Sequence, residues 1–233
     1  ISAWVSRLRA GGSGAAEQPA AFGLSAEQLA EVHEQLGPAS GVATSGMRAG
    51  DAAAAIARAL PYPVEVDPSA REALAAEYVL TDDLSALSGG SALAAALRPL
   101  GLVAAPRPVN GEIRLLIADV RAVEQSWPIG WPMEGSPREV APKLYEFLEV
   151  EINDTPLLEA MGAIGGRLGM PLVWDYNNMA RHRVNPEELR VTLPGGRTYY
   201  KRILDRMLAP HLTAELRLDE AGSPFLWITT VKK

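Results

Sequence analysis

Three histidines and the absence of cysteine limit the metal and nucleophile chemistry that this chain can perform. His33, His182 and His211 stand far apart, and none belongs to an HxH, HxxxH or HExxH motif that would place two imidazoles on one metal ion. Without cysteine there is no thiolate nucleophile, Cys-ligated zinc, iron–sulfur cluster or disulfide. We therefore expect no metal site and no cofactor, and we expect the histidines at surface or loop positions.

Paired carboxylates are the second residue type that could do chemistry, because acid–base catalysis needs two carboxyl groups held at a set distance in a cleft. The pairs are Asp82 with Asp83, Glu187 with Glu188, and Asp219 with Glu220. All three pairs lie in polar segments or at a helix start, where acidic side chains complement the helix dipole. We predict solvated capping residues rather than catalytic groups.

Two further motifs of catalytic sites are incomplete or missing. The segment PGGRT at 194–198 lacks the GxxxxGK[ST] frame of a phosphate-binding loop, and its counterpart SGGSA at 88–92 also lacks the basic residue. Both segments are predicted to be turns that lead into helices. No GxSxG motif occurs, so a strained serine nucleophile is not indicated either. We expect no catalytic residue and a protein that is not an enzyme.

Basic side chains around residue 200 are candidates for partner binding. Arg197 with Lys201, and Arg202 with Arg206, are spaced i, i+4, which predicts one basic face on a helix of an otherwise acidic chain. This face is either a solvated surface, partly neutralised by Asp205, or a docking surface for an acidic partner or an anionic wall polymer.

Two tryptophans, Trp127 and Trp131, lie in the proline-rich segment WPIGWP. Such a pair could form an aromatic platform for a sugar or a peptide. The alternative, which we favour, is that the rings hold the segment against its own domains.

Composition excludes several classes of protein. The 233 residues are 48% hydrophobic and carry a net charge of −6, which argues against binding to nucleic acid or to anionic lipid. No run approaches the roughly 18 apolar residues that span a bilayer, so we expect no membrane insertion.

An internal repeat is the strongest indication of architecture. With an offset of 108 residues, the strand expected at 172–175 falls on 64–67, and apolar positions of the second half fall on apolar positions of the first, namely Val150 on Val42, Ile164 on Ile56 and Leu168 on Leu60. The Gly-Gly pairs at 195 and 89 match with an offset of 106. Self-similarity of this kind predicts two copies of one unit.

The second copy has the clearer pattern of elements. Alternation over 148–152 predicts a half-buried strand, and a helical stripe follows at Leu157, Met161, Ile164 and Leu168, with Gly169 as its stop. Strands are predicted at 172–175, 212–218 and 225–231, and a helix after the Gly-Gly turn. Each copy is therefore predicted as β-α-β-β-α-β-β, an α+β fold with its helices packed on small mixed sheets.

These patterns predict four segments. A leader and a short helix occupy 1–39, with Ser25 and Gln28 as a capping box for that helix. The first repeat spans 40–120, a Pro- and Trp-rich linker spans 121–145, and the second repeat spans 146–233.

The repeated unit resembles the short N-terminal domain shared by secretins and TonB-dependent receptors. Leu148 to Asp175 and Gly195 to Val231 carry the resemblance, and Val42 to Asp67 and Gly89 to Ile117 carry it more weakly. The resemblance implies a periplasmic or otherwise exported module that contacts other envelope proteins and has no catalytic residues.

We therefore expect a non-enzymatic protein-interaction module of the bacterial cell envelope, with oligomer formation possible. The alternative is a cell-wall carbohydrate- or peptide-binding protein or a hydrolase that uses the cleft between the repeats, with Trp127, Trp131, Arg181 and His182 lining it. A third possibility is a structural scaffold or oligomer subunit with a large apolar interface. A cleft lined by polar groups with shifted pKa would favour the alternative.

Overall fold

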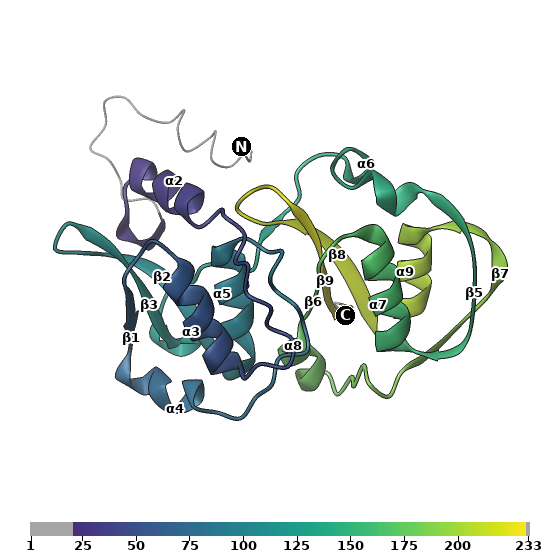
Figure 1. The fold of residues 1–233 in the computed structure, drawn as a ribbon, viewed down its shortest axis with the longest axis horizontal. Coiled ribbons are helices and arrows are strands. Elements are labelled where there is room, and N and C mark those ends of the chain that lie inside the picture. Colours follow the sequence, from purple (N-terminus) through teal and green to yellow (C-terminus); the bar gives the residue numbers. More distant parts are fainter. Residues whose placement is uncertain (1–20, 232–233) are drawn as a thin grey trace. The chain divides into compact units, whose positions relative to one another are not determined.

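The computed structural model describes residues 21–231. The first part of the predicted leader therefore lies outside the described residues. The chain divides into two compact units: unit 1 is formed by the residues up to Trp131 together with Leu218–Ser223, and unit 2 by Pro132–Arg217 and the residues from Pro224 on. Both units mix helices with small sheets, so the fold is α+β as predicted (Figure 1).

Unit 1 packs its helices on a three-stranded sheet (Figure 1). Its elements are η1 (Ala21–Gly23), α2 (Ala26–Gln35), α3 (Ala49–Ala59), β1 (Val64–Val66), η2 (Pro68–Ala70), α4 (Arg71–Leu74), α5 (Gly89–Leu97), η3 (Arg98–Leu100), β2 (Leu102–Val109), β3 (Glu112–Asp119) and η4 (Val120–Ala122). The strand order is β1-β3-β2, in which β1 runs parallel and β2 antiparallel to β3. All nine residues of α5 are buried, which its small Gly, Ala and Ser side chains permit because neighbours can approach the backbone closely.

Unit 2 places two helices between two sheets (Figure 1). Its elements are β4 (Trp131–Pro132), α6 (Pro137–Val140), η5 (Pro142–Tyr145), β5 (Phe147–Pro156), α7 (Leu157–Leu168), β6 (Leu172–Trp174), α8 (Tyr176–Arg181), β7 (Arg190–Tyr199), α9 (Tyr200–Leu208), β8 (Leu212–Leu218) and β9 (Pro224–Thr230). The first residue of β4, Trp131, and the last residue of β8, Leu218, belong to unit 1. One sheet has the order β4-β8-β9-β6, with β6 parallel to β9, and the other is the antiparallel pair β5-β7. The side chains of α7 and α9 fill the core between them.

Local patterns predicted several elements correctly. Ser25 and Gln28 form the expected capping box, in which each side chain accepts a hydrogen bond from the other residue's backbone N–H. The predicted stripe of α7 is buried, and Gly169 ends this helix with a φ of 63°. Exposure alternates along the first half of β5 as predicted. These features depend on near neighbours in sequence, which is why sequence patterns predict them.

Two predicted elements of the repeats were wrong. The strand expected around Val42 does not form, because the segment near it makes only isolated bridges, Ala39 with Ser88 and Arg48 with Val79. The segment 194–198 is not a turn but part of β7, where it pairs with β5 through backbone hydrogen bonds. Its counterpart at Gly89 does begin a helix. The predicted linker contains the short helical segments α6 and η5.

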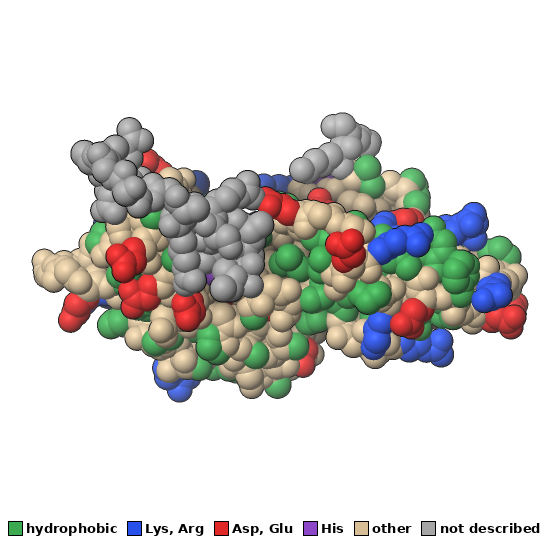
Figure 2. Space-filling view, turned by 90° about the horizontal axis from the view of Figure 1, so that it is seen from above, with side chains coloured by type: hydrophobic (Ala, Val, Ile, Leu, Met, Phe, Trp, Pro, Cys, Tyr) green, Lys and Arg blue, Asp and Glu red, His purple; other side chains and the backbone are tan. Residues whose placement is uncertain are grey.

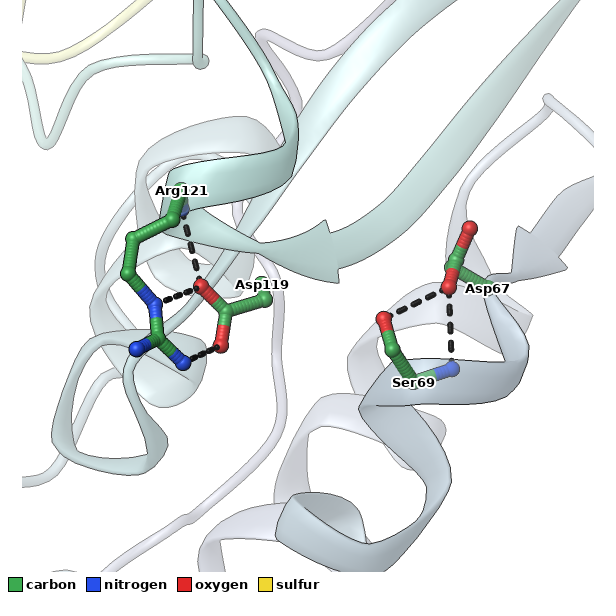
Figure 3. A network of polar contacts seen from close by, with 4 residues as sticks. All are labelled: Asp67, Ser69, Asp119 and Arg121. Carbon is green, nitrogen blue, oxygen red and sulfur yellow. Dashed lines mark hydrogen bonds and ion pairs between the residues drawn. The ribbon is translucent and has the colours of Figure 1, made fainter.

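Aspartates that follow strands cap the next turn. Asp67, after β1, accepts hydrogen bonds from the backbone N–H and the hydroxyl of Ser69 at 2.9 and 2.6 Å (Figure 3). Asp119, at the end of β3, accepts from the backbone N–H of Arg121 at 2.8 Å and pairs with its guanidinium, and these contacts hold the pKa of Asp119 well below its usual value. Asp175, after β6, likewise accepts from a backbone N–H of α8. These carboxylates close local structure rather than face a ligand.

Candidate functional site

The turn between β8 and β9 buries two neighbouring carboxyl groups within unit 1. Asp219 is 2% exposed and Glu220 is 6% exposed. The prediction that this pair is solvated was therefore wrong. The polar sequence of the turn is typical of a surface loop, but the turn packs on the N-terminus of α5, where burial comes from residues distant in sequence.

Every carboxylate oxygen of this pair has a protein donor. Glu220 accepts a hydrogen bond at Oε1 from the indole N–H of Trp127 at 2.6 Å and at Oε2 from the hydroxyl of Ser91 at 2.8 Å. Asp219 accepts from the backbone N–H of Ser88, the N-cap of α5, at 3.0 Å and from a backbone N–H of its own turn at 2.8 Å. The positive end of the α5 dipole favours both groups.

Burial raises the pKa of Glu220 to about 7, against the opposing effect of its two hydrogen bonds. A carboxyl group with such a pKa has the acidity of a general acid or base. However, its surroundings leave no space for a substrate, because a Cβ on Gly90 would lie 2.2 Å from Oε1 of Glu220 and 2.6 Å from Nε1 of Trp127. We therefore assign this cluster to the packing of unit 1 rather than to catalysis.

The two tryptophans of the predicted linker belong to an aromatic cluster of unit 1. Trp127 is 4% exposed, and its ring lies 5.9 Å from Phe22, 6.4 Å from His33 and 5.6 Å from Trp131, measured between ring centroids. With these neighbours and its N–H bonded to Glu220, Trp127 has no free ring face for a sugar or a peptide. The structure thus favours the interpretation in which Trp127 holds its segment against unit 1.

His33 was predicted at the surface, and this was wrong. Its ring is 4% exposed and lies 4.7 Å from the ring of Trp131. Helix α2 is amphipathic, and His33 directly follows Val32 on its buried side. Burial lowers the pKa of His33 to about 4, although the nearby charge of Asp219 acts in the opposite direction. By contrast, His182 and His211 are exposed.

We expect the His33 imidazole to remain neutral down to a pH of about 4. Two-dimensional NMR of the ring protons across pH 3.5–8 measures its midpoint directly, and the exposed His182 and His211 provide reference signals in the same spectra. A His33 midpoint above pH 6 would contradict the buried position.

The other two carboxylate pairs lie at the surface, as predicted. Asp83 is exposed and accepts a hydrogen bond from the backbone N–H of Ser85 at 3.0 Å. Glu188 is exposed and accepts one from the side-chain amide of Asn185 at 2.9 Å. Both arrangements stabilise local turns.

Unit 2 contains a groove of about 510 Å³. Its walls come from the segments around β4 and α6, from η5, from α9, and from β8 with β9, and apolar side chains such as Met133, Leu144 and Leu216 form most of its lining. Charged residues in the lining are Lys201, Glu215 and Arg217. Neither His33 nor Glu220, the two buried side chains whose pKa values are strongly shifted by burial, lines this groove.

This groove follows the edge of a strand. Four consecutive residues of β8, 214–217, line it, and because successive side chains of a strand point to opposite faces, the groove reaches the edge of this strand. Leu226 of β9, on the other side of β8, lines it as well. On this side of β8 the neighbouring strand is β4, which has two residues against seven in β8 and includes Pro132, which has no N–H. Most of the β8 edge therefore has no partner strand in the part of the chain that the structure describes.

A row of rings and guanidinium groups adjoins the groove; we call it the aromatic row. Arg138 lies over Tyr145 at 4.7 Å, Tyr145 stacks on Tyr199 at 6.0 Å, Tyr199 meets Phe147 edge to face at 5.8 Å, and Arg197 lies over Phe147 at 5.2 Å. Phe147 is 63% exposed. Tyr145 also lines the groove, so the row and the groove form one continuous surface.

The structure separates the four basic residues that were predicted on one helix face. Arg197 lies in β7 and belongs to the aromatic row, which corrects its assignment to the helix. Lys201 is at the start of α9, forms an ion pair with Asp205 and lines the groove. Arg202 and Arg206 are exposed on α9, one turn apart as predicted.

Sequence reasoning missed the aromatic row, and it did not indicate that the open sheet edge would be that of β8. Tyr145 ends η5 and Phe147 begins β5, so the alternation of side chains along a strand does not relate the two rings. Tyr199 joins them only through the pairing of Phe147 with Tyr199 between β5 and β7, which no local pattern encodes.

Among residues 21–231, no group of three or more His, Asp and Glu side chains is arranged to hold a metal ion. Within the same range, none of the helices has the length and apolarity required to cross a membrane. Comparison of the chain with protein families, curated proteins and solved structures found no match.

Proposed function

We propose that this chain is a non-enzymatic protein-interaction module of the bacterial cell envelope, built from two units of the kind found at the N-termini of secretins and TonB-dependent receptors. The order of elements in unit 2, β5-α7-β6-β7-α9-β8-β9 with α8 inserted, supports the resemblance. In unit 1, α3-β1-α5-β2-β3 has the same order as α7-β6-α9-β8-β9, and the strand orders β1-β3-β2 and β6-β9-β8 correspond. An exported or periplasmic location is part of this proposal and rests on the resemblance.

The observation that carries the proposal is the open edge of β8 in an apolar groove. An extended segment of a partner can add to such an edge, because backbone N–H and C=O groups at the edge of a sheet can pair with a further strand. The main-chain hydrogen bonds supply affinity, and the groove supplies contacts for alternate side chains of the segment.

The alternative function, a carbohydrate- or peptide-binding protein or a hydrolase, was predicted to use a cleft lined by Trp127, Trp131, Arg181 and His182. Trp127 is buried, and the carboxyl group with the raised pKa, Glu220, is enclosed by protein atoms. For this reason we favour the interaction module.

Selection of displayed random peptides on the intact chain tests the proposal. We expect the selection to yield peptides that bind in an extended conformation. Their binding should protect the backbone amides of β8 from hydrogen exchange, because these amides then donate hydrogen bonds to the peptide strand. Replacing Met133, which lines the groove, by Asn is expected to lower the affinity for these peptides about tenfold. The matched control is Val120→Asn, since Val120 is an exposed apolar residue of unit 1.

The proposal would be contradicted if no peptide is selected. It would also be contradicted if the selected peptides leave the β8 amides unprotected and bind the Met133→Asn variant with the same affinity as the wild type. The hydrolase would instead be favoured if the wild type releases soluble fragments from purified peptidoglycan and the Glu220→Gln variant does not.

A further inference from the structure

A guanidinium group lies at the rim of the groove. Arg138 lies over the ring of Tyr145, and that ring also lines the groove. Among the described residues, no carboxylate forms an ion pair with Arg138. A guanidinium over a ring keeps N–H donors available, and these can bind a carboxylate with two hydrogen bonds.

The other charged groups of the groove form ion pairs. Lys201 and Arg217 line it together with one carboxylate, Glu215, whose charge is balanced by an ion pair with Arg217 at 2.8 Å. Lys201 is held at the groove by its pair with Asp205. Lys201 and Arg217 are therefore each balanced by a carboxylate, and Arg138 is the cation at this groove that has no carboxylate partner among the described residues.

Unit 2 is closer to neutral than the chain as a whole. It has thirteen Lys and Arg residues against twelve Asp and Glu, a net charge of +1, whereas the chain as a whole has a net charge of −6. In the view of Figure 2, hydrophobic side chains lie at the surface beside those of lysine and arginine. Apolar contact and positive charge thus occur together on this protein.

We propose that the groove selects an acidic partner: an extended segment with alternating apolar and carboxylate side chains, whose carboxylates are bound by Arg138 and Lys201. In an extended segment alternate side chains share one face, so its apolar residues can lie against Tyr145 and Leu216 while the carboxylates face the rim. This inference rests on the proposed addition of a strand to β8, and it names the chemistry of the partner.

Three synthetic ten-residue peptides test the charge preference on the intact chain. They alternate Val with Asp, Val with Lys, and Val with Ser, and fluorescence anisotropy measures their affinities. We expect the Val–Asp peptide to bind at least about tenfold more tightly than the Val–Lys peptide, with a difference that shrinks at high salt.

Charge reversal at the rim supplies the decisive comparison. Arg138→Glu is expected to lower the affinity for the Val–Asp peptide about five- to tenfold and to raise the affinity for the Val–Lys peptide. The reason is that this substitution puts a carboxylate in the place of the exposed guanidinium. Arg167→Glu is the matched control, since Arg167 is an exposed arginine of α7 that does not line the groove.

The outcomes separate this inference from the function on which it rests. If the Val–Ser peptide binds as tightly as the Val–Asp peptide and still protects β8, strand addition stands and the acidic preference is overturned. If no peptide binds and β8 stays unprotected, both fail. If the chain forms a dimer that Met133→Asn dissociates, a second copy occupies the groove and the acidic partner is overturned.

Discussion

Replacing Glu220 by Gln is expected to stabilise unit 1 by about 3 kcal/mol at pH 8 and by less than about 1 kcal/mol at pH 5. The pKa of Glu220 is about 7 in the folded protein and 4.5 in the reference state. Because the folded pKa is the higher one, the stabilisation from Glu220 is complete below pH 4.5 and is lost as pH rises through 7. Gln keeps the shape and can donate to Ser91, as a protonated carboxyl group does.

Urea unfolding of both proteins between pH 5 and pH 8 measures this difference. His33 has the opposite dependence, because its folded pKa is lowered to about 4 and its contribution to stability is lost as pH falls from 6.5 through that value. The contributions of Glu220 and His33 to stability change with pH in opposite directions where their pH ranges overlap. The informative quantity is therefore the free energy of unfolding of the variant minus that of the wild type at each pH. Glu72→Gln, at an exposed position of unit 1, is the control, and a Glu220→Gln effect independent of pH would contradict the argument.

Replacing Gly50 by Ala is expected to destabilise unit 1 by about 3 kcal/mol. A Cβ at this position of α3 would lie 2.0 Å from the carbonyl oxygen of Leu74, at the end of α4, and 3.0 Å from its carbonyl carbon. Both groups are backbone, so the clash cannot be relieved by rotation of a side chain and the two helices must move apart. Thermal unfolding followed by circular dichroism measures the loss.

Gly162→Ala provides the matched control for this substitution. Gly162 lies in α7, and a Cβ there would meet no atom within 4 Å. The same change is therefore expected to stabilise unit 2 by about 0.5–1 kcal/mol, because Ala loses less backbone entropy than Gly in a helix. Equal effects of the two substitutions would show that the close approach at Gly50 is absent.

Much of the architecture of unit 2 followed from patterns along the chain. The apolar stripe from Leu157 to Leu168 and the alternating exposure along β5 each depend on residues of a single helix or strand. The structure has this helix and this strand where they were predicted. The Gly-Gly segments show the limit of such reasoning. Similar sequences begin a helix at Gly89 and lie in a strand at Gly195, because the second pairs with β5 and the first packs against the side chain of Leu60.

The candidate sites depended on contacts between distant residues. Glu220 has the sequence surroundings of a solvated turn, yet its hydrogen-bond partners Trp127 and Ser91 lie 93 and 129 positions away. The aromatic row requires the register that sets Phe147 opposite Tyr199. Arg197 lies in β7 rather than in the predicted basic helix, because this strand continues to Tyr199, directly before α9.

By itself, the sequence determined the α+β class, the cap at Ser25, the apolar stripe of α7 and the alternation of β5, since propensity, capping and periodicity act over a few residues. Only the tertiary structure decided which polar residues are buried, which strand edge is left open and which arginine meets which ring. Burial and strand register are set by packing between segments far apart in the chain, and the local composition of a turn such as that of Asp219 and Glu220 contains no record of it.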